Sequence, residues 1–223
     1  MRPIDICNQL NSFFAQCMAD QFIEAFETHK IDSNSTHQFL GPVSPQKMIS
    51  GTGITFEEYI VLLDNNSYSA VFFDASIISI QCYFDGNDIK GHRYIYIPCP
   101  VNADLLIDRP ASISLADWLR YADSDKLRHS YHSSGNMRFD FSADMAPNPN
   151  HPHPVSHLTF GSPSCRIPVK APLSPSGFLE FIFENYYRHY LQKWRHFEPH
   201  LRCLGLTDTI SRAEIAKHHF SWS

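Results

Sequence analysis

The sequence lacks the charge and the apolar runs that would place it in two large classes of protein. Its 18 lysines and arginines are outnumbered by 23 aspartates and glutamates, which gives a net charge of −5. Bulk charge therefore argues against a basic nucleic-acid-binding protein, and any such contact needs a local patch. No run is long and apolar enough to span a membrane. Polar residues interrupt the N-terminus, which argues against a signal peptide.

The six cysteines contain no CxxC pair, and most of them stand inside apolar runs. A free cysteine in such a run acts as a small hydrophobic residue. We therefore expect free thiols, a reducing cytoplasmic setting and no membrane partner. The sequence also lacks a phosphate loop, because residues 51–53 (Gly-Thr-Gly) are not followed by Gly-Lys-Ser/Thr.

The sequence is rich in hydrophobic and aromatic residues, which suit a packed core. Hydrophobic residues make up 43% of its 223 residues, with 17 phenylalanines and 10 tyrosines among them. A chain of this length can bury a substantial core. No internal repeat and no long linker divides it, so we expect a single domain over residues 1–223.

Apolar spacing and capping residues predict helices near both ends of the chain. The spacing predicts a long N-terminal helix from Pro3 to about Lys30, followed by a loop over residues 31–53. A capping box formed by Thr55 and Glu58 predicts a helix that ends near Asn65. Three further helices are expected, over residues 114–121, over residues 175–197 after the Ser174 cap and Pro175, and over residues 211–220.

Three strands are expected between residues 68 and 98, because Val, Ile, Phe and Tyr are frequent there. They span Tyr68–Asp74, Ser76–Phe84 and Asp88–Pro98. The Asp-Gly step at residues 85–86 predicts a hairpin between the second and the third strand. In the third strand, His92, Tyr94 and Tyr96 share a face, and we expect them to pack under a helix rather than to bind a ligand.

The stretch from residue 136 to 169 concentrates Arg, Asp and His beside short apolar runs. The runs Met137–Ala143, Val155–Gly161 and Ser164–Val169 alternate between apolar and polar residues, as strands of an antiparallel sheet do when one face is buried. The short turn at residues 161–163 predicts a hairpin between the last two. If the three runs are neighbours, one polar face carries the side chains of Arg138, Asp140, His157, Thr159 and Arg166.

Two interpretations of this face are open. In the functional one, Asp140 orients His157 as a general base or acid, His153 is a second acid or base, and Arg138 and Arg166 hold a phosphate group. In the structural one, Asp140 forms ion pairs with one of the arginines, and His157 packs under a helix with its nitrogens satisfied.

The loop over residues 144–154 contains four prolines, which exclude a helix. His153 and His157 are therefore no helical metal pair, and in extended chain they lie about 13 Å apart. They could share a metal only if the chain turns between them, together with Asp140 and His151. No residue is assigned as a metal ligand, and a divalent metal is left open as a cofactor.

The stretches RFDF, HPVSHLTFG, CRIPVKAPLSP and FLEFIFENYY resemble a bacterial family catalogued as domain-of-unknown-function family 2290. The resemblance also takes in the RYIYIPCP strand and the N-terminal helix, and His151 departs from its pattern. It implies a bacterial, cytoplasmic, single-domain protein and supplies no activity. The matching positions are Arg138, Asp140, His153, Pro154, Ser156, His157, Gly161, Arg166, Pro168, Pro172 and Pro175.

A looser likeness is to small toxin-like proteins with an Arg-Asp strand followed by clustered histidines, which implies action on RNA. From the residues together, we expect an α+β fold with an antiparallel sheet of about six strands and long N- and C-terminal helices packed on it. The first functional hypothesis is a nuclease or other phosphodiester-acting protein of a phage-defence or toxin-type system. The alternative is a non-catalytic binding or assembly subunit of a multi-protein defence complex, with a protein partner, and a nucleotide sensor is a third hypothesis.

Overall fold

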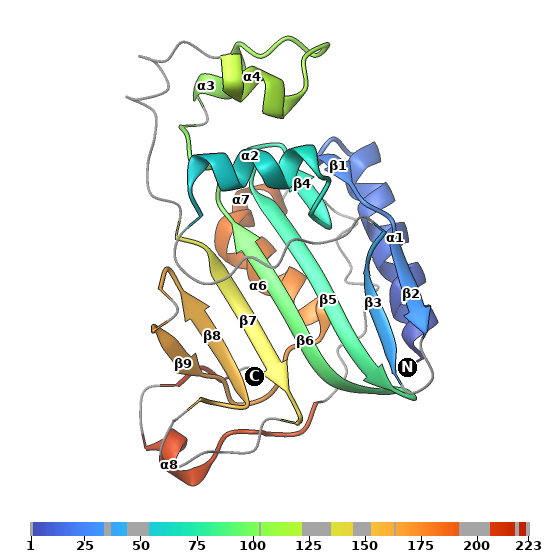
Figure 1. Ribbon diagram of the computed structural model, residues 1–223, viewed down its shortest axis with the longest axis vertical. Helices are drawn as coiled ribbons and strands as arrows, with labels where there is room; N and C mark the ends of the chain where they lie inside the picture. Colours follow the sequence, from blue (N-terminus) through green and yellow to red (C-terminus); the bar gives the residue numbers. More distant parts are fainter. Residues whose placement is uncertain are drawn as a thin grey trace.

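The computed structural model describes residues 2–33, 37–43, 54–102, 104–121, 135–144, 153–162, 164–191, 206–216 and 219–221. These residues form one antiparallel sheet with helices on both of its faces (Figure 1). The α+β class is confirmed, but the sheet has nine strands instead of about six. The strands are β1 (Ile23–Phe26), β2 (His29–Ser33), β3 (Gln38–Pro42), β4 (Ala70–Phe72), β5 (Ile77–Asp85), β6 (Asp88–Ile97), β7 (Met137–Ser142), β8 (Ser156–Phe160) and β9 (Arg166–Pro168). The helices are α1 (Pro3–Ala19), α2 (Phe56–Asp64), α3 (Asp104–Ile107), α4 (Leu115–Tyr121), α6 (Pro175–Tyr186), α7 (Arg188–Leu191) and α8 (Arg212–Ile215).

The long strands β5 and β6 form the centre of the sheet. One edge of β5 pairs first with β4 and then with β3, which in turn pairs with β2. The other edge pairs with β6, and β7, β8 and β9 follow in succession. The predicted hairpin between β5 and β6 is confirmed, and its turn places Gly86 at a φ of +60°. All three strands of the central stretch are therefore neighbours, as the polar face requires.

The prediction of one helix from Pro3 to about Lys30 is wrong beyond Ala19. Gln21 adopts a φ of +59°, and the Phe22 amide donates a hydrogen bond to the carbonyl oxygen of Cys17 at 2.8 Å. This closes α1 and turns the chain into β1 and β2. Apolar residues at positions 22, 23 and 26 continue the helical spacing, but Ile23 instead pairs with Phe72 of β4. The expected loop over residues 31–53 likewise contains the end of β2 and all of β3, and residues 44–53 lie outside the described part.

The predicted caps of two helices are confirmed. Thr55 accepts a hydrogen bond from the Glu58 amide at 3.1 Å at the start of α2, and Ser174 accepts one from the Gly177 amide at 3.0 Å at the start of α6. However, α6 ends at Tyr186 and does not run to residue 197, and residues 192–205 are outside the described part. The expected helix over residues 211–220 shortens to α8. Within the described residues, no helix combines the length and the apolar character needed to cross a membrane.

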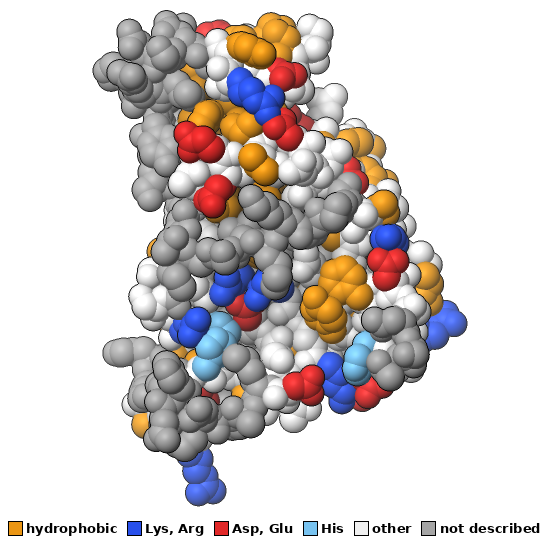
Figure 2. All heavy atoms as spheres, viewed as in Figure 1, with side chains coloured by type: hydrophobic (Ala, Val, Ile, Leu, Met, Phe, Trp, Pro, Cys, Tyr) orange, Lys and Arg blue, Asp and Glu red, His pale blue; other side chains and the backbone are white. Residues whose placement is uncertain are grey.

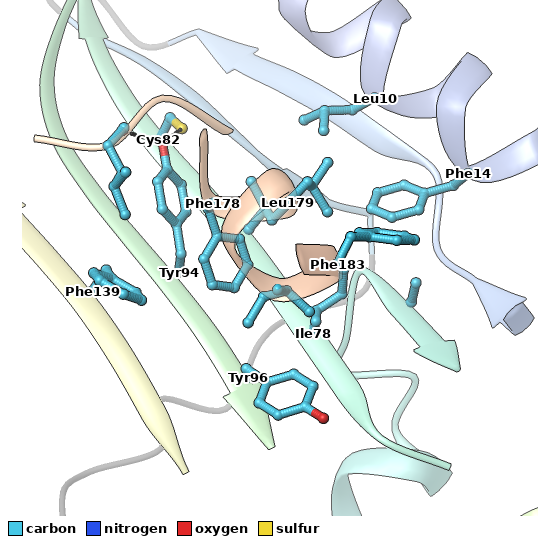
Figure 3. Packing of buried hydrophobic residues seen from close by; sticks show 14 of the residues in the cluster. Leu10, Phe14, Ile78, Cys82, Tyr94, Tyr96, Phe139, Phe178, Leu179 and Phe183 are labelled. Carbon is cyan, nitrogen blue, oxygen red and sulfur yellow. Dashed lines mark hydrogen bonds between the residues drawn. The ribbon is translucent and has the colours of Figure 1, made fainter. Parts of the chain in front are cut away.

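One face of the sheet, here called the back face, is covered by α1 and α6. Phe178, Leu179 and Phe183 of α6 reach toward the strands, and side chains from α1 enter the same core (Figure 3). The Tyr94 ring lies 5.2 Å from the Phe178 ring and stacks on it. His92 and Tyr96 also point to this face and are buried, so their predicted packing role is confirmed.

On the opposite face, here called the front face, the described helices lie over one end of the sheet only. There, α2 lies over the strand ends with α4 beyond it, and apolar side chains of both helices belong to the same buried cluster as Val71, Ile77, Ile95 and Ile97 (Figure 1). The part of the front face formed by the far ends of these strands and by β7, β8 and β9 has no described helix over it. It is this open part that carries the polar side chains of the central stretch.

Candidate functional site

Three adjacent strands place Arg93, Asp140 and His157 in one row across the front face. The register pairs Arg93 of β6 with Asp140 of β7, and Asp140 with His157 of β8. Directly opposite residues in an antiparallel pair have their side chains on the same face, about 5 Å apart. The sheet thus brings together an acid and a histidine that are 17 residues apart in the chain and an arginine from a more distant strand.

Asp140 is the hub of this row. Its Oδ1 atom accepts a hydrogen bond from Nε of Arg93 at 2.8 Å, and its Oδ2 atom accepts one from Nε of Arg138 at 2.5 Å. Burial alone would raise the pKa of Asp140, but the neighbouring imidazole and the two guanidinium groups outweigh it and hold that pKa well below its usual range. The carboxylate is therefore ionised at neutral pH. The ion pair expected in the structural interpretation is present with Arg138.

His157 is almost completely buried, with 2% of the residue exposed. Its Nδ1 donates a hydrogen bond to the carbonyl oxygen of Pro154 at 3.1 Å. Its Nε2 lies 3.5 Å from Oδ2 of Asp140 and has no hydrogen-bond partner among the described residues. This distance exceeds the roughly 2.6–3.2 Å of a hydrogen-bonded acid–base pair. Both ring nitrogens face protein atoms, so this geometry suits a positioning role better than direct contact with a substrate.

His153 is more accessible and lies against His157. The two rings meet edge to face with their centroids 4.5 Å apart. The chain therefore turns between them instead of running extended over about 13 Å, and the Pro154 carbonyl accepts hydrogen bonds from Nδ1 of both. Burial, the neighbouring imidazole and the charge of Arg166 lower the pKa of His153. His153 is thus a neutral base near pH 7 at the edge of the row.

A second row on the same face consists of Arg138, Thr159 and Arg166 on β7, β8 and β9. The Oγ1 atom of Thr159 is buried and has no hydrogen-bond partner within the described ranges. Arg166 is exposed and forms no ion pair or side-chain hydrogen bond with any described residue. The row therefore adds one guanidinium group whose donors are bound to no residue in the described ranges.

The first row, together with Arg138 and Arg166 of the second, lines an open cavity of about 690 Å³ on the front face. Basic, acidic and histidine side chains gather there over β6, β7 and β8 (Figure 2). Four of the lining residues are Lys or Arg and three are Asp, so the cavity is slightly positive in a chain whose net charge is −5. A volume of this size matches typical small-ligand sites.

Sequence reasoning placed Arg138, Asp140, His153, His157 and Arg166 in this region, and all five line the cavity. It missed Arg93. The sequence predicts that Arg93 and His92 point to opposite faces of their strand, but it does not predict that Arg93 pairs with Asp140. It also missed the aromatic wall formed by Phe39 and Tyr83. His151 lies outside the described residues. No group of three or more His, Cys, Asp or Glu in the described part is arranged to hold a metal ion.

Comparison with known proteins supports one assignment. The search of curated proteins and the search of solved structures found no match. A family described as "Uncharacterized conserved protein (DUF2290)" matches residues 14–222. This range contains both rows of the site and every strand of the sheet, so the chain belongs to the DUF2290 family.

Proposed function

We propose that the cavity on the front face binds a phosphodiester-bearing ligand and that the protein is a nuclease. The observation that carries the proposal is that three guanidinium groups line one cavity: those of Arg93 and Arg138, which are paired with Asp140, and that of Arg166. Guanidinium groups offer a planar fork of donors that matches phosphate oxygens, and they stay charged at every physiological pH. A cluster in which one member, Arg166, has no ion-pair partner among the described residues is the arrangement that an anionic ligand would complete.

The ion pairs on Asp140 support this arrangement because they fix the arginines before a ligand arrives. Arg93 and Arg138 each use Nε to bind the carboxylate. The side chain of Arg93 remains 27% exposed, and its terminal nitrogens form no hydrogen bond with the described residues. A donor group held in place loses little conformational freedom on binding, which favours affinity. Asp140 therefore acts in this proposal as a positioning residue for the anion site.

The proposed cleavage step uses His153 as the group that accepts or donates a proton at the phosphodiester. Its lowered pKa keeps it neutral at pH 7, and a correctly placed acid–base group contributes about 10²–10⁴-fold to a rate. His157 packs against its ring and is proposed to orient it. A divalent metal held partly by the substrate is compatible with this proposal, and the assays below include one.

The experiment measures binding and cleavage of fluorescently labelled RNA and DNA oligonucleotides, with and without Mg²⁺ or Mn²⁺. Arg166→Ala should weaken binding and lower the slope of log affinity against log salt by about one. Arg188→Ala is the matched control, because Arg188 is exposed on α7 away from the cavity. His153→Ala should abolish cleavage and leave binding intact. Equal effects of the two arginine variants, or no binding at low salt, would refute the proposal.

A second candidate is a non-catalytic binding or assembly subunit, as expected from the alternative interpretation of the sequence. The burial of His157 and the distance of its Nε2 from Asp140 favour it. Oligonucleotide binding without cleavage under any of these conditions would support this candidate. The placement in a phage-defence or toxin-type system is proposed from the sequence likeness alone.

A further inference from the structure

The cavity contains an aromatic pair that plays no part in phosphate binding. Phe39 of β3 and Tyr83 of β5 are directly opposite each other in the sheet. Their ring centroids are 4.9 Å apart and their planes are tilted by 48°. Both line the same cavity as the arginines. Tyr83 is 47% exposed, which leaves much of its ring available to a partner.

The sheet beside Tyr83 is bare backbone. Its cross-strand neighbour on β6 is Gly91, which has no side chain. A Cβ atom at this position would lie 3.2 Å from the carbonyl oxygen of Phe141 and 3.6 Å from Cδ2 of Tyr83. Any other residue would therefore crowd the floor next to the ring. With glycine there, a flat group can lie on the floor and against Tyr83.

The arginines stand at two distances from this ring. Because Tyr83 pairs with Gly91, Arg93 is its diagonal cross-strand neighbour, and such positions are about 7–8 Å apart. Arg166 is on β9, four strands from the β5 strand that carries Tyr83, which corresponds to about 19 Å at a strand spacing of about 4.8 Å. One base with its own phosphate covers the first distance. Only a chain of more than one nucleotide reaches Arg166 as well.

We infer that the ligand is a single-stranded nucleic acid, with one base stacked on Tyr83, one phosphate on Arg93 and a phosphate farther along the strand on Arg166. This inference rests on the proposed function and names its substrate class. A base in a duplex has both faces covered by its neighbours, whereas an unpaired base can be stacked on an aromatic side chain. Stacking tolerates every base, because each has a π face. The site is therefore selective for single strands and nearly indifferent to sequence.

The test compares two single-stranded oligonucleotides of equal length by fluorescence anisotropy: a 12-residue oligothymidylate and the same strand with abasic sites in place of its bases. Tyr83→Ala should weaken binding of oligothymidylate by about 5- to 150-fold, the range that alanine substitution of a stacking residue gives. It should leave binding of the abasic strand unchanged. Tyr83→Phe, which keeps the ring, should bind both strands as the unchanged protein does.

The unchanged affinity for the abasic strand also shows that Tyr83→Ala has kept its fold. Tyr186→Ala is the matched control, since Tyr186 is 43% exposed on α6, against the back face. If Tyr83→Ala binds oligothymidylate normally while Arg166→Ala does not, this inference fails and the proposed function stands. The same holds if a duplex of the same length binds more tightly than the single strand. If the unchanged protein binds no oligonucleotide, both fail together.

Discussion

The two faces of β6, β7 and β8 are built from adjacent residues and have opposite properties. In each of these strands, one residue of a consecutive pair enters the ring-rich core of the back face and the other enters the polar rows of the front face. The pairs are Arg93 and Tyr94, Phe139 and Asp140, and His157 and Leu158. Strand alternation alone therefore separates an apolar surface that forms the core from a surface that carries polar and charged groups.

The two faces also differ in how much stability their buried groups contribute. Burying an ion pair stabilises a protein little or not at all compared with a well-packed apolar replacement. The front face nevertheless holds Asp140 and its two guanidinium partners on the inner strands β6 and β7, and beside them Oγ1 of Thr159 has no hydrogen-bond partner among the described residues. At the other end of the same face, α2 and α4 cover apolar side chains. The polar half therefore adds little stability for what it buries, which is consistent with the ligand-binding role proposed above.

The largest expected effect is the loss of stability when a large side chain is removed from the core on the back face. Phe178 is fully buried and stacks on Tyr94. Phe178→Ala should lower the free energy of unfolding by about 3–5 kcal/mol, because it removes a large side chain and leaves a cavity. Urea denaturation followed by circular dichroism measures this loss. Phe160→Ala is the control, since Phe160 is 47% exposed and should cost far less. Similar losses in the two variants would contradict the assignment of the core.

The next effect tests the hub of the front face. Asp140→Asn leaves two guanidinium groups without their carboxylate and should lower the free energy of unfolding by about 3 kcal/mol at pH 7. Asp117→Asn is the control, because Asp117 forms an exposed pair with Arg120, and such pairs contribute about 0.2–1 kcal/mol.

The pH dependence of the Asp140 effect follows from the direction of its pKa shift. A carboxyl group whose pKa is lowered on folding stabilises the protein above its unfolded pKa of about 4, and this stabilisation is lost as the pH falls through the folded value. The unchanged protein and Asp140→Asn should therefore differ in their free energy of unfolding by a constant amount from pH 7 to about pH 5. This difference should shrink below pH 4. A difference that grows on acidification would show that the carboxyl is not ionised in the fold.

Alternation made the front face predictable, because it depends only on neighbours in the sequence. Arg138, Asp140 and His157 were placed on one face from their spacing, and the register confirms it. Arg93 was not placed there because its pairing with Asp140 joins strands separated by residues 98–136. The order of strands in a sheet depends on how such connections fold, and local sequence carries little information about it. Tyr83 was missed as a wall of the site for a related reason, because β3 beside it was expected to be a loop.

The N-terminal error has a different cause. Phe22 and Ile23 continue the helical spacing of α1, so periodicity alone extends the helix past Ala19. The chain turns at Gln21 instead, because β1 can pair with β4 and the Phe22 ring can stack on Phe183 of α6, with centroids 5.0 Å apart. These contacts are tertiary, and tertiary contacts routinely override local preference. The end of α6 could not be predicted for the same reason, since Tyr187 leaves the helix and donates hydrogen bonds to both carboxylate oxygens of Asp74.

The smallest expected effect concerns the histidines of the back face. Burial lowers the pKa of His29 to about 4 and that of His92 to about 3. Nε2 of His92 accepts a hydrogen bond from the Leu173 amide at 3.2 Å, just before α6 begins, so the neutral ring helps to hold that helix. Because the unfolded chain binds these protons near pH 6.5 and the folded chain does not, stability falls as the pH drops below 6.5.

Each of these two histidines should lower the free energy of unfolding by about 2 kcal/mol when the pH falls from 7 to 5. His92→Gln keeps an acceptor for the Leu173 amide but cannot titrate, so its free energy of unfolding should fall less between pH 7 and pH 5 than that of the unchanged protein. Urea denaturation at the two pH values measures the difference. Phe141→Leu, next to the His92 ring, is the control for a change in packing alone and should leave the pH dependence as it was. If His92→Gln and the unchanged protein lose equal stability over this range, then His92 binds its proton at the same pH in the folded and the unfolded chain, and its burial does not lower its pKa.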